Sequence, residues 1–164
     1  MTYEVIDNYL PDADFTRIQR TLMGPDFPWY LNNNIIRPTD PFHKNDFQLV
    51  HALYNQPAQA SPFLQVLDPL IGAINPKALI RIKANLGPIT AEHYETGYHN
   101  DYPFPCKTAC FYINTNNGYT KFETGEVVES VANRLMIFDS NMRHTGATQT
   151  DEKVRVVLNL NFFD

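Results

Sequence analysis

His99-Asn100-Asp101, in the middle of the chain, has a spacing that could place two metal ligands side by side. In an extended strand alternate side chains project from the same face, so the His99 imidazole and the Asp101 carboxylate would be neighbours. A second histidine on a neighbouring strand would complete a set of two imidazoles and one carboxylate, which leaves open coordination positions and suits non-haem Fe(II). His144 is the candidate, and we expect His99 and Asp101 at the end of one strand with His144 reaching them from across a sandwich of strands. Alone, His-x-Asp also occurs at solvated strand ends, so the surrounding segments have to support it.

Several segments around these residues are informative because of their order. In the chain they are 94–101, 109–114, 118–122, 133–140, His144 and the apolar stretch that begins at Arg155. Taken together, from about residue 81 to the C-terminus, they resemble the Fe(II)/2-oxoglutarate-dependent dioxygenases, specifically the prolyl 4-hydroxylase-like branch. The resemblance implies that His99, Asp101 and His144 hold Fe(II), with 2-oxoglutarate and O₂ as cosubstrates. The implied reaction couples oxidative decarboxylation of 2-oxoglutarate, to succinate and CO₂, to hydroxylation of a substrate.

Arg155 follows His144 by 155 − 144 = 11 residues, where the family places the cation that pairs with the distal carboxylate of 2-oxoglutarate. A guanidinium offers a bidentate match to a carboxylate. Strand alternation puts Arg155 on one face with Val157, Asn159 and Asn161. Buried polar groups need partners, which a bound dicarboxylate would provide. The alternative is an edge strand with a solvated Arg155.

Two tyrosines and one asparagine are further candidates for cosubstrate binding. Some relatives carry Ser or Thr two residues after the arginine, where this chain has Val157. Tyr112 matches a tyrosine that the hydroxylase branch uses instead. Tyr94 matches another cosubstrate-facing tyrosine, with a packed aromatic side chain as the equal alternative. Asn159 shares the face of Arg155 and completes the predicted cosubstrate set.

The composition indicates a globular protein that we expect to form one domain over residues 1–164. The net charge is −5 without a Lys/Arg cluster, so we expect no nucleic-acid partner. No run of about 18 apolar residues predicts a membrane span, and the first residues do not have the pattern of a signal peptide. Cys106 and Cys110 do not fit a zinc spacing and are expected to be free thiols in a reducing cytoplasm. The sequence predicts no oligomeric state.

The N-terminal half predicts supporting helices and a few strands. Residues 2–6 and 27–31 read as strands, and 47–54 as a strand or a short helix. A helix should open at 11–14 with an Asp as N-cap and stop at 24–25. A second should begin at Ser61-Pro62 and be kinked or divided at Pro69. His51 is expected to be a hydrogen-bonded structural residue.

From residue 78 the pattern changes to the alternation of strands. Arg81, Lys83 and Asn85 share a polar face that either is solvated or lines a wet cavity. Short strands with turn signals then follow to the C-terminus, which predicts a mainly β fold with supporting helices, a sandwich or jelly roll. The resemblance supplies the specific form, a cupin-like double-stranded β-helix.

The polar segment 32–45 is long for a loop, and we expect it to cover the mouth of the barrel, with His43 on the surface. The leading function is oxidation of a peptide or small-molecule C–H bond. Asp101 favours hydroxylation or another oxidation over halogenation, because related halogenases have a small residue there. One alternative is a cupin-type metal-dependent dioxygenase without 2-oxoglutarate. The other is a catalytically silent jelly-roll binding module.

Overall fold

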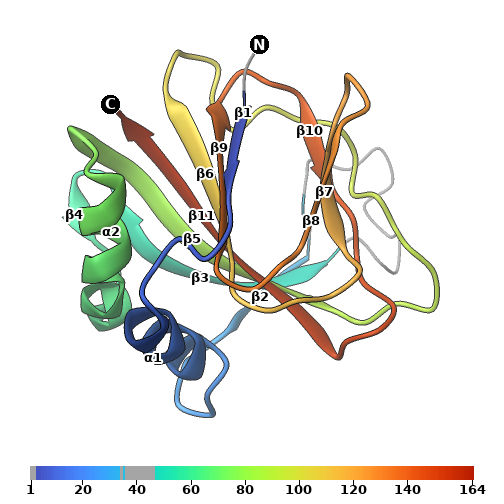
Figure 1. The fold of residues 1–164 in the computed structure, drawn as a ribbon, viewed down its shortest axis with the longest axis horizontal. Coiled ribbons are helices and arrows are strands. Elements are labelled where there is room, and N and C mark those ends of the chain that lie inside the picture. Colours follow the sequence, from blue (N-terminus) through green and yellow to red (C-terminus); the bar gives the residue numbers. More distant parts are fainter. Residues whose placement is uncertain (1–2, 34, 36–46) are drawn as a thin grey trace.

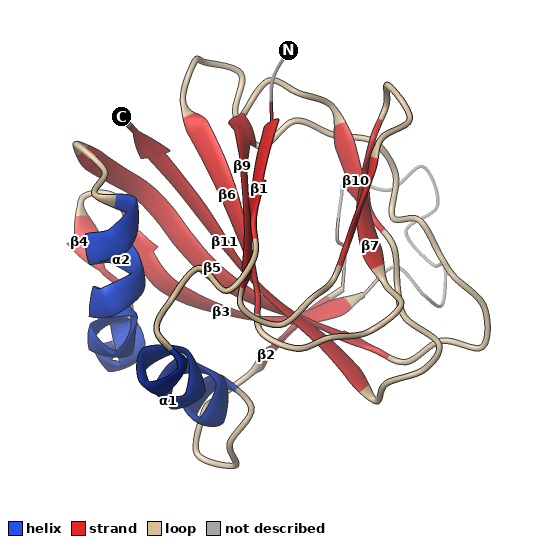
Figure 2. Cartoon of the chain, in the orientation of Figure 1, coloured by secondary structure: helices blue, strands red, loops and turns tan. Residues whose placement is uncertain are grey.

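The computed structural model describes residues 3–33, 35 and 47–164, and it contains two facing β-sheets with helices outside the larger one (Figure 1, Figure 2). The larger sheet has, in order, β1 (Tyr3–Ile6), β9 (Arg134–Asp139), β6 (Lys107–Tyr112), β11 (Val154–Phe163), β5 (Ala78–Pro88), β3 (Gln48–Asn55) and β2 (Tyr30–Asn32), with β4 (Ala58–Gln59) paired to β3. The smaller sheet has β10 (His144–Gly146), β7 (Tyr119–Phe122) and β8 (Val127–Glu129). The mainly β architecture with supporting helices is therefore as predicted.

Two helical segments cover the outer face of the larger sheet. The first is α1 (Asp12–Leu22), whose N-cap is Pro11 without a side-chain hydrogen bond, so the prediction of an Asp cap is wrong. Asp12 and Asp14 instead lie inside the first turn, where their charge favours the positive end of the helix dipole. The second begins at Ser61, whose hydroxyl accepts a hydrogen bond from the Phe63 amide at 3.1 Å. It is divided, as predicted, into the 3₁₀ helix η1 (Pro62–Leu67) and α2 (Asp68–Ile74).

The predicted strand at 27–31 is displaced to Tyr30–Asn32, because Phe27 is buried in an aromatic cluster with Trp29 and Phe63 and does not pair with a strand. The segment whose assignment stayed open, 47–54, is the strand β3. His51 in β3 bonds to the Pro28 carbonyl at 2.6 Å and the Ser61 hydroxyl at 2.7 Å, so it is the structural histidine that the sequence predicted.

Residues 34 and 36–46 lie outside the described part of the chain, so the lid prediction for 32–45 and the position of His43 stay predictions. Cys106 and Cys110 are both buried free thiols, as expected. Among the described residues, neither helix has the length and apolar character needed to cross a membrane.

The central strands of the larger sheet have two different faces. On β11, Val156, Leu158 and Leu160 pack into the apolar core beneath the helices. Arg155, Val157 and Asn159 of the same strand line a cavity on the inner face, between the sheets. The polar face of β5 lines this cavity too, which decides between the two interpretations left open for it. Because β11 lies between β5 and β6, the edge-strand alternative for Arg155 is wrong.

Candidate metal centre

His99, Asp101 and His144 meet at one point on the inner side of the fold. Their potential ligand atoms all lie within 4.8 Å of one another, close enough to face a single ion. His99 and His144 are separated by 144 − 99 = 45 residues but pair directly. The His99 amide donates to the His144 carbonyl at 2.9 Å, and the His144 amide donates back at 3.0 Å. The two imidazole ring centroids are 4.5 Å apart.

The backbone of this site differs from the expectation in two respects. His144 is the bridge partner of His99 and does not approach it from across the sandwich. His99 forms an isolated bridge, and Asp101 lies in a bend instead of at the end of a regular strand. The chain turns toward β6 here, and Pro103 and Pro105 have no N–H with which to continue a strand ladder.

Both imidazoles are oriented by backbone carbonyls. His144 Nδ1 lies 2.9 Å from the Met142 carbonyl oxygen, and His99 Nδ1 lies 3.3 Å from that of Gly97. A carbonyl can only accept, so Nδ1 carries a proton in each ring, and it is Nε2 that would offer its lone pair to a metal. Burial, and then the neighbouring His144, lower the pKa of His99, which favours the neutral form that a metal ligand needs.

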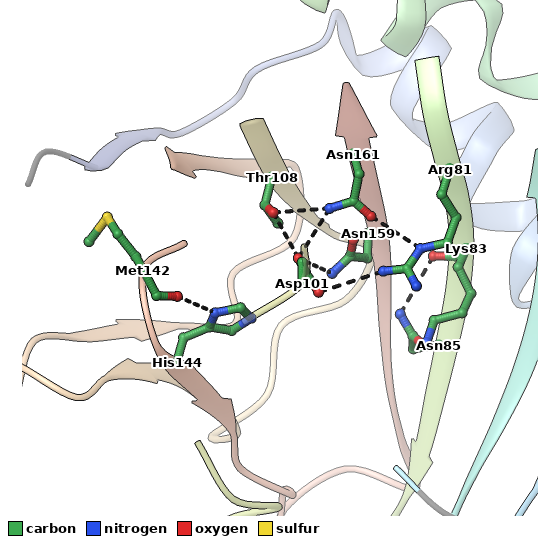
Figure 3. Close-up of polar contacts among 9 residues, drawn as sticks. All are labelled: Arg81, Lys83, Asn85, Asp101, Thr108, Met142, His144, Asn159 and Asn161. Atoms are coloured by element: carbon green, nitrogen blue, oxygen red, sulfur yellow. Dashed lines mark hydrogen bonds and ion pairs between the residues drawn. The ribbon is translucent and has the colours of Figure 1, made fainter. Parts of the chain in front are cut away.

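The Asp101 carboxylate is held by polar side chains from three strands (Figure 3). Its side chain is only 5% exposed. Oδ2 accepts hydrogen bonds from Thr108 at 2.7 Å, Asn161 at 3.2 Å and Asn159 at 3.4 Å, while Oδ1 lies 3.6 Å from Nη2 of Arg81. Burial on its own would raise the pKa of Asp101, but His144, the Thr108 bond and Arg81 outweigh it and hold the pKa below its usual value. The carboxylate is therefore ionised at neutral pH.

The two asparagines of β11 do not have equal partners. Asn161 donates to Asp101 and to Thr108 at 3.0 Å, and its Oδ1 accepts from Arg81 Nε at 3.1 Å. It has its partners within the protein, so the expectation that a bound dicarboxylate would satisfy it is wrong. Asn159 has only the long bond to Asp101, and its Oδ1 is buried without a partner among the described residues.

A cavity of about 140 Å³ opens from the three ligand residues toward Arg155. The Arg155 guanidinium donates to the hydroxyls of Ser130 at 2.7 Å and Thr120 at 3.3 Å. In the described part of the chain, no carboxylate lies within the 4.0 Å of an ion pair. A Cβ at Gly118 would lie 2.7 Å from Arg155 Cδ, so the glycine makes room for this side chain. A cation with only neutral partners facing a cavity is suited to bind an anion.

No protein-family model matches the sequence, and no curated protein matches it. Solved structures do match. A prolyl hydroxylase from Trichoplax adhaerens, in complex with a hypoxia inducible factor peptide fragment, is 14% identical with a TM-score of 0.70 over 99% of this chain and 83% of that chain. A Pseudomonas putida prolyl-4-hydroxylase is 19% identical with a TM-score of 0.62 over 99% and 92%. HygX from Streptomyces hygroscopicus, with nickel and 2-oxoglutarate bound, is 12% identical with a TM-score of 0.64 over 98% and 82%.

The chain has the fold of the 2OG-Fe(II) oxygenases. The predicted double-stranded β-helix, a cupin-like jelly roll, is therefore confirmed. Within this oxygenase fold the smaller sheet contributes His144, and the segment paired to it contributes His99. The larger sheet contributes the partners of Asp101 and Arg155.

The two tyrosines predicted for the cosubstrate do not line the cavity as described. Tyr112 is fully buried between the sheets, and its hydroxyl donates to Thr120 at 2.9 Å. Arg155 lies over its ring, with Cζ 5.7 Å from the centroid, so Tyr112 contacts the proposed cation. Tyr94 is partly buried and pairs through its backbone with Thr148. A role of either side chain toward the cosubstrate stays a prediction.

Thr108 and Arg81 belong to the site but were not recognised as partners of Asp101 in the sequence. Both carried a signal, because Thr108 alternates with Cys110 and Tyr112 on β6, and Arg81 belongs to the polar face of β5. The alternation could place them on the inner face. It could not show that both converge on one carboxylate.

Proposed function

We propose that this protein is a non-haem Fe(II) oxygenase that couples oxidative decarboxylation of 2-oxoglutarate to hydroxylation of a peptidyl or small-molecule substrate. One observation carries the proposal: a cluster of two imidazoles and a carboxylate shares a cavity with an arginine that has no carboxylate partner among the described residues. The first feature fits Fe(II) with open positions, and the second fits the far carboxylate of a dicarboxylate cosubstrate.

The donor set of the cluster fits iron. Two imidazoles present Nε2, and the ionised Asp101 presents Oδ1 while its other oxygen is held by Thr108 and Asn161. Bound Fe(II) would supply the redox chemistry that couples O₂ and 2-oxoglutarate to oxidation of a C–H bond. Arg155 would bind and orient the cosubstrate from the other end of the cavity, fixed by Ser130 and Thr120.

Hydroxylation is proposed over halogenation because Asp101 supplies the carboxylate that related halogenases replace with a small residue. The similar structures do not decide the outcome, since they include an epimerase and a carbocyclase besides the prolyl hydroxylases. One of them was solved with a peptide, and another is an epimerase in complex with nogalamycin RO. Both peptide and small-molecule substrates therefore remain within the proposal.

Two alternatives fit the structure less well. A cupin-type dioxygenase without 2-oxoglutarate would not need the buried cation Arg155 in the cavity. A silent binding module would not need an ionised Asp101 held in place at the cost of desolvation, together with two histidines oriented toward it. Neither alternative accounts for both features at once.

Substitution of Arg155 tests the proposal. In Arg155→Ala the Fe(II) affinity should change little, because the Arg155 guanidinium is not one of the predicted metal ligands. The 2-oxoglutarate affinity should fall sharply, since loss of one member of a buried charge pair costs about 2–5 kcal/mol. That corresponds to a rise in Kd of roughly 30- to 4,000-fold. The measurement is an anaerobic titration of 2-oxoglutarate into the Fe(II) protein, followed by the metal-to-ligand absorption band.

Two further variants are compared with Arg155→Ala in the same titration. Arg155→Lys keeps the charge and loses the bidentate geometry, so its affinity should fall between those of the parent and Arg155→Ala. Arg17→Ala removes an exposed arginine on α1 and should leave the titration unchanged. If Arg155→Ala binds 2-oxoglutarate as tightly as the parent, the cosubstrate assignment fails and the cupin-type alternative moves ahead.

A further inference from the structure

A second cation in the cavity has no role in the chemistry described so far. Lys83 extends from β5 between Arg81 and Asn85 (Figure 3). It lines the same cavity as His99 and Asp101. Among the described residues, its ammonium group has neither a hydrogen bond nor a carboxylate within 4.0 Å. Burial, and then Arg81, lower the pKa of Lys83 to about 8, against an opposing effect of Asp101. The ammonium is therefore still mainly protonated at neutral pH.

Each of the other two cations of the cavity has an anion assigned to it, one in the protein and one in the proposed cosubstrate. Arg81 pairs with Asp101, so its charge is already balanced within the protein. It also lies over the Tyr102 ring, with Cζ 5.4 Å from the centroid. Arg155 would be matched by the distal carboxylate of 2-oxoglutarate. Lys83 is the one charged group of the described lining that neither the protein nor the proposed cosubstrate neutralises.

A charge count of the described lining also leaves an excess of positive charge. Three cations, Arg81, Lys83 and Arg155, face one carboxylate, Asp101, so the sum with neutral histidines is 3 − 1 = +2. Fe(II) and 2-oxoglutarate carry opposite charges of equal size and leave this excess unchanged. A partly desolvated excess of positive charge is unfavourable unless an anion joins it.

Unpartnered amide oxygens of the residues that line the cavity add a second requirement. Oδ1 of Asn85, Oδ1 of Asn159 and Oε1 of Gln149 are buried without a hydrogen-bond partner in the described structure, and all three residues line this cavity. Such amide oxygens need donors, for example the hydroxyl or amino groups of a bound molecule. The unmatched groups of the cavity thus comprise one cation and several acceptors.

We infer that Lys83 forms a subsite for an acidic group of the oxidised substrate, and that this substrate is an acid that also carries hydroxyl or amino donors. The inference rests on the proposed function for the identity of the reaction. The subsite itself rests on the unmatched groups of the cavity. It narrows the substrate class from any peptide or small molecule to one with an anionic group near the metal centre.

The test compares acetate with acetamide, which have nearly the same shape and differ in charge. Each probe is titrated anaerobically into the Co(II)-substituted protein saturated with 2-oxoglutarate. Saturation-transfer NMR reports contact with the protein, and broadening of the methyl signal by Co(II) reports proximity to the metal. We expect saturable broadening of acetate and at least about 10-fold weaker binding of acetamide, the size of effect that one charge-assisted hydrogen bond produces.

Three variants test whether acetate binds at Lys83. Lys83→Met should weaken acetate binding by roughly 10- to 100-fold, Lys83→Arg should largely retain it, and Lys77→Met, at an exposed lysine just before β5, should behave as the parent. Unchanged acetate binding in Lys83→Met, or no preference for acetate in the parent, would overturn the subsite.

A separate titration distinguishes this subsite from the cosubstrate site. If Lys83→Met lowers the affinity for 2-oxoglutarate as strongly as Arg155→Ala, Lys83 serves the cosubstrate and the inference is wrong. If the parent binds no 2-oxoglutarate at all, the proposed function fails. The dependence of acetate binding on Lys83 can then still be measured with Co(II) alone.

Discussion

The two faces of the larger sheet belong to the same strands but have opposite chemistry. Toward the helices, β11 and β5 present Leu158, Leu160 and Ile82, each at most 1% exposed in a continuous apolar cluster. Toward the smaller sheet, the alternate residues include charged and amide side chains in a cavity. Burial of apolar area provides the main favourable term of folding, whereas buried polar groups only repay their desolvation when they are paired.

This difference shows which side chains have their partners within the protein and which need a bound ligand. The helix-facing core needs no ligand, because its side chains complete one another. The inner face satisfies Asp101 and Asn161 through one another but leaves Lys83, Asn159 and the charge of Arg155 without full partners among the described residues. The inner face is therefore only complete with bound ligands, and this distinction can be tested one face at a time.

The substitutions with the largest expected effects should alter metal binding on one face and stability on the other. His99→Ala should abolish stoichiometric Fe(II) binding while changing the free energy of unfolding of the metal-free protein by less than about 1 kcal/mol. Leu158→Ala should lower that free energy by about 2–5 kcal/mol, because it leaves a cavity in a fully buried core, and should spare metal binding by the folded protein. Urea denaturation with chelator and anaerobic metal analysis measure the two quantities.

His144→Ala should lose iron like His99→Ala, with some cost in stability because its ring is buried against Phe138. If both histidine variants bind iron as tightly as the parent, the metal site lies elsewhere. In that case the inner face would not be the metal-binding face of the larger sheet.

A smaller effect should come from the support of Asp101. Thr108→Val has nearly the same shape and removes the 2.7 Å hydrogen bond to Oδ2. Loss of a group that orients a metal ligand typically costs about 10- to 100-fold in affinity, so the Kd for Fe(II) should rise by that factor. Competition with a chromophoric chelator measures it, with Thr124→Val in the exposed turn after β7 as control. An unchanged Kd would show that the metal does not depend on this network.

The smallest effect should come from Tyr112→Phe. Its hydroxyl bonds to Thr120, which also accepts from Arg155, so the variant loses one buried hydrogen bond next to the proposed cation. The 2-oxoglutarate affinity should fall by about 0.5–1.5 kcal/mol, or roughly 2- to 13-fold. The same anaerobic titration measures it. A loss as large as that of Arg155→Ala would mean that the hydroxyl binds the cosubstrate directly.

Much of the inner face could be predicted from local patterns. The alternation of β11 and β5 placed Arg155, Asn159 and Lys83 on the faces where the structure has them, because the side-chain period of a strand is fixed by its backbone. The spacing of His99 and Asp101 also identified them as neighbours. The local patterns predicted the ends of elements less reliably, because several neighbouring residues could take the same position, as at the N-cap of α1 and the start of β2.

What the sequence by itself determined is which side chains share a face of a strand and which chemistry they could support. The tertiary structure decided their partners: His99 pairs with a residue 45 positions away, and Asp101 is held by Thr108, Arg81 and Asn161 from three strands. It also decided that Lys83 has no anionic partner among the described residues while Arg81 beside it does. Such pairings depend on strand register and on the path of the chain between strands. These follow from packing of the whole domain and not from any local pattern.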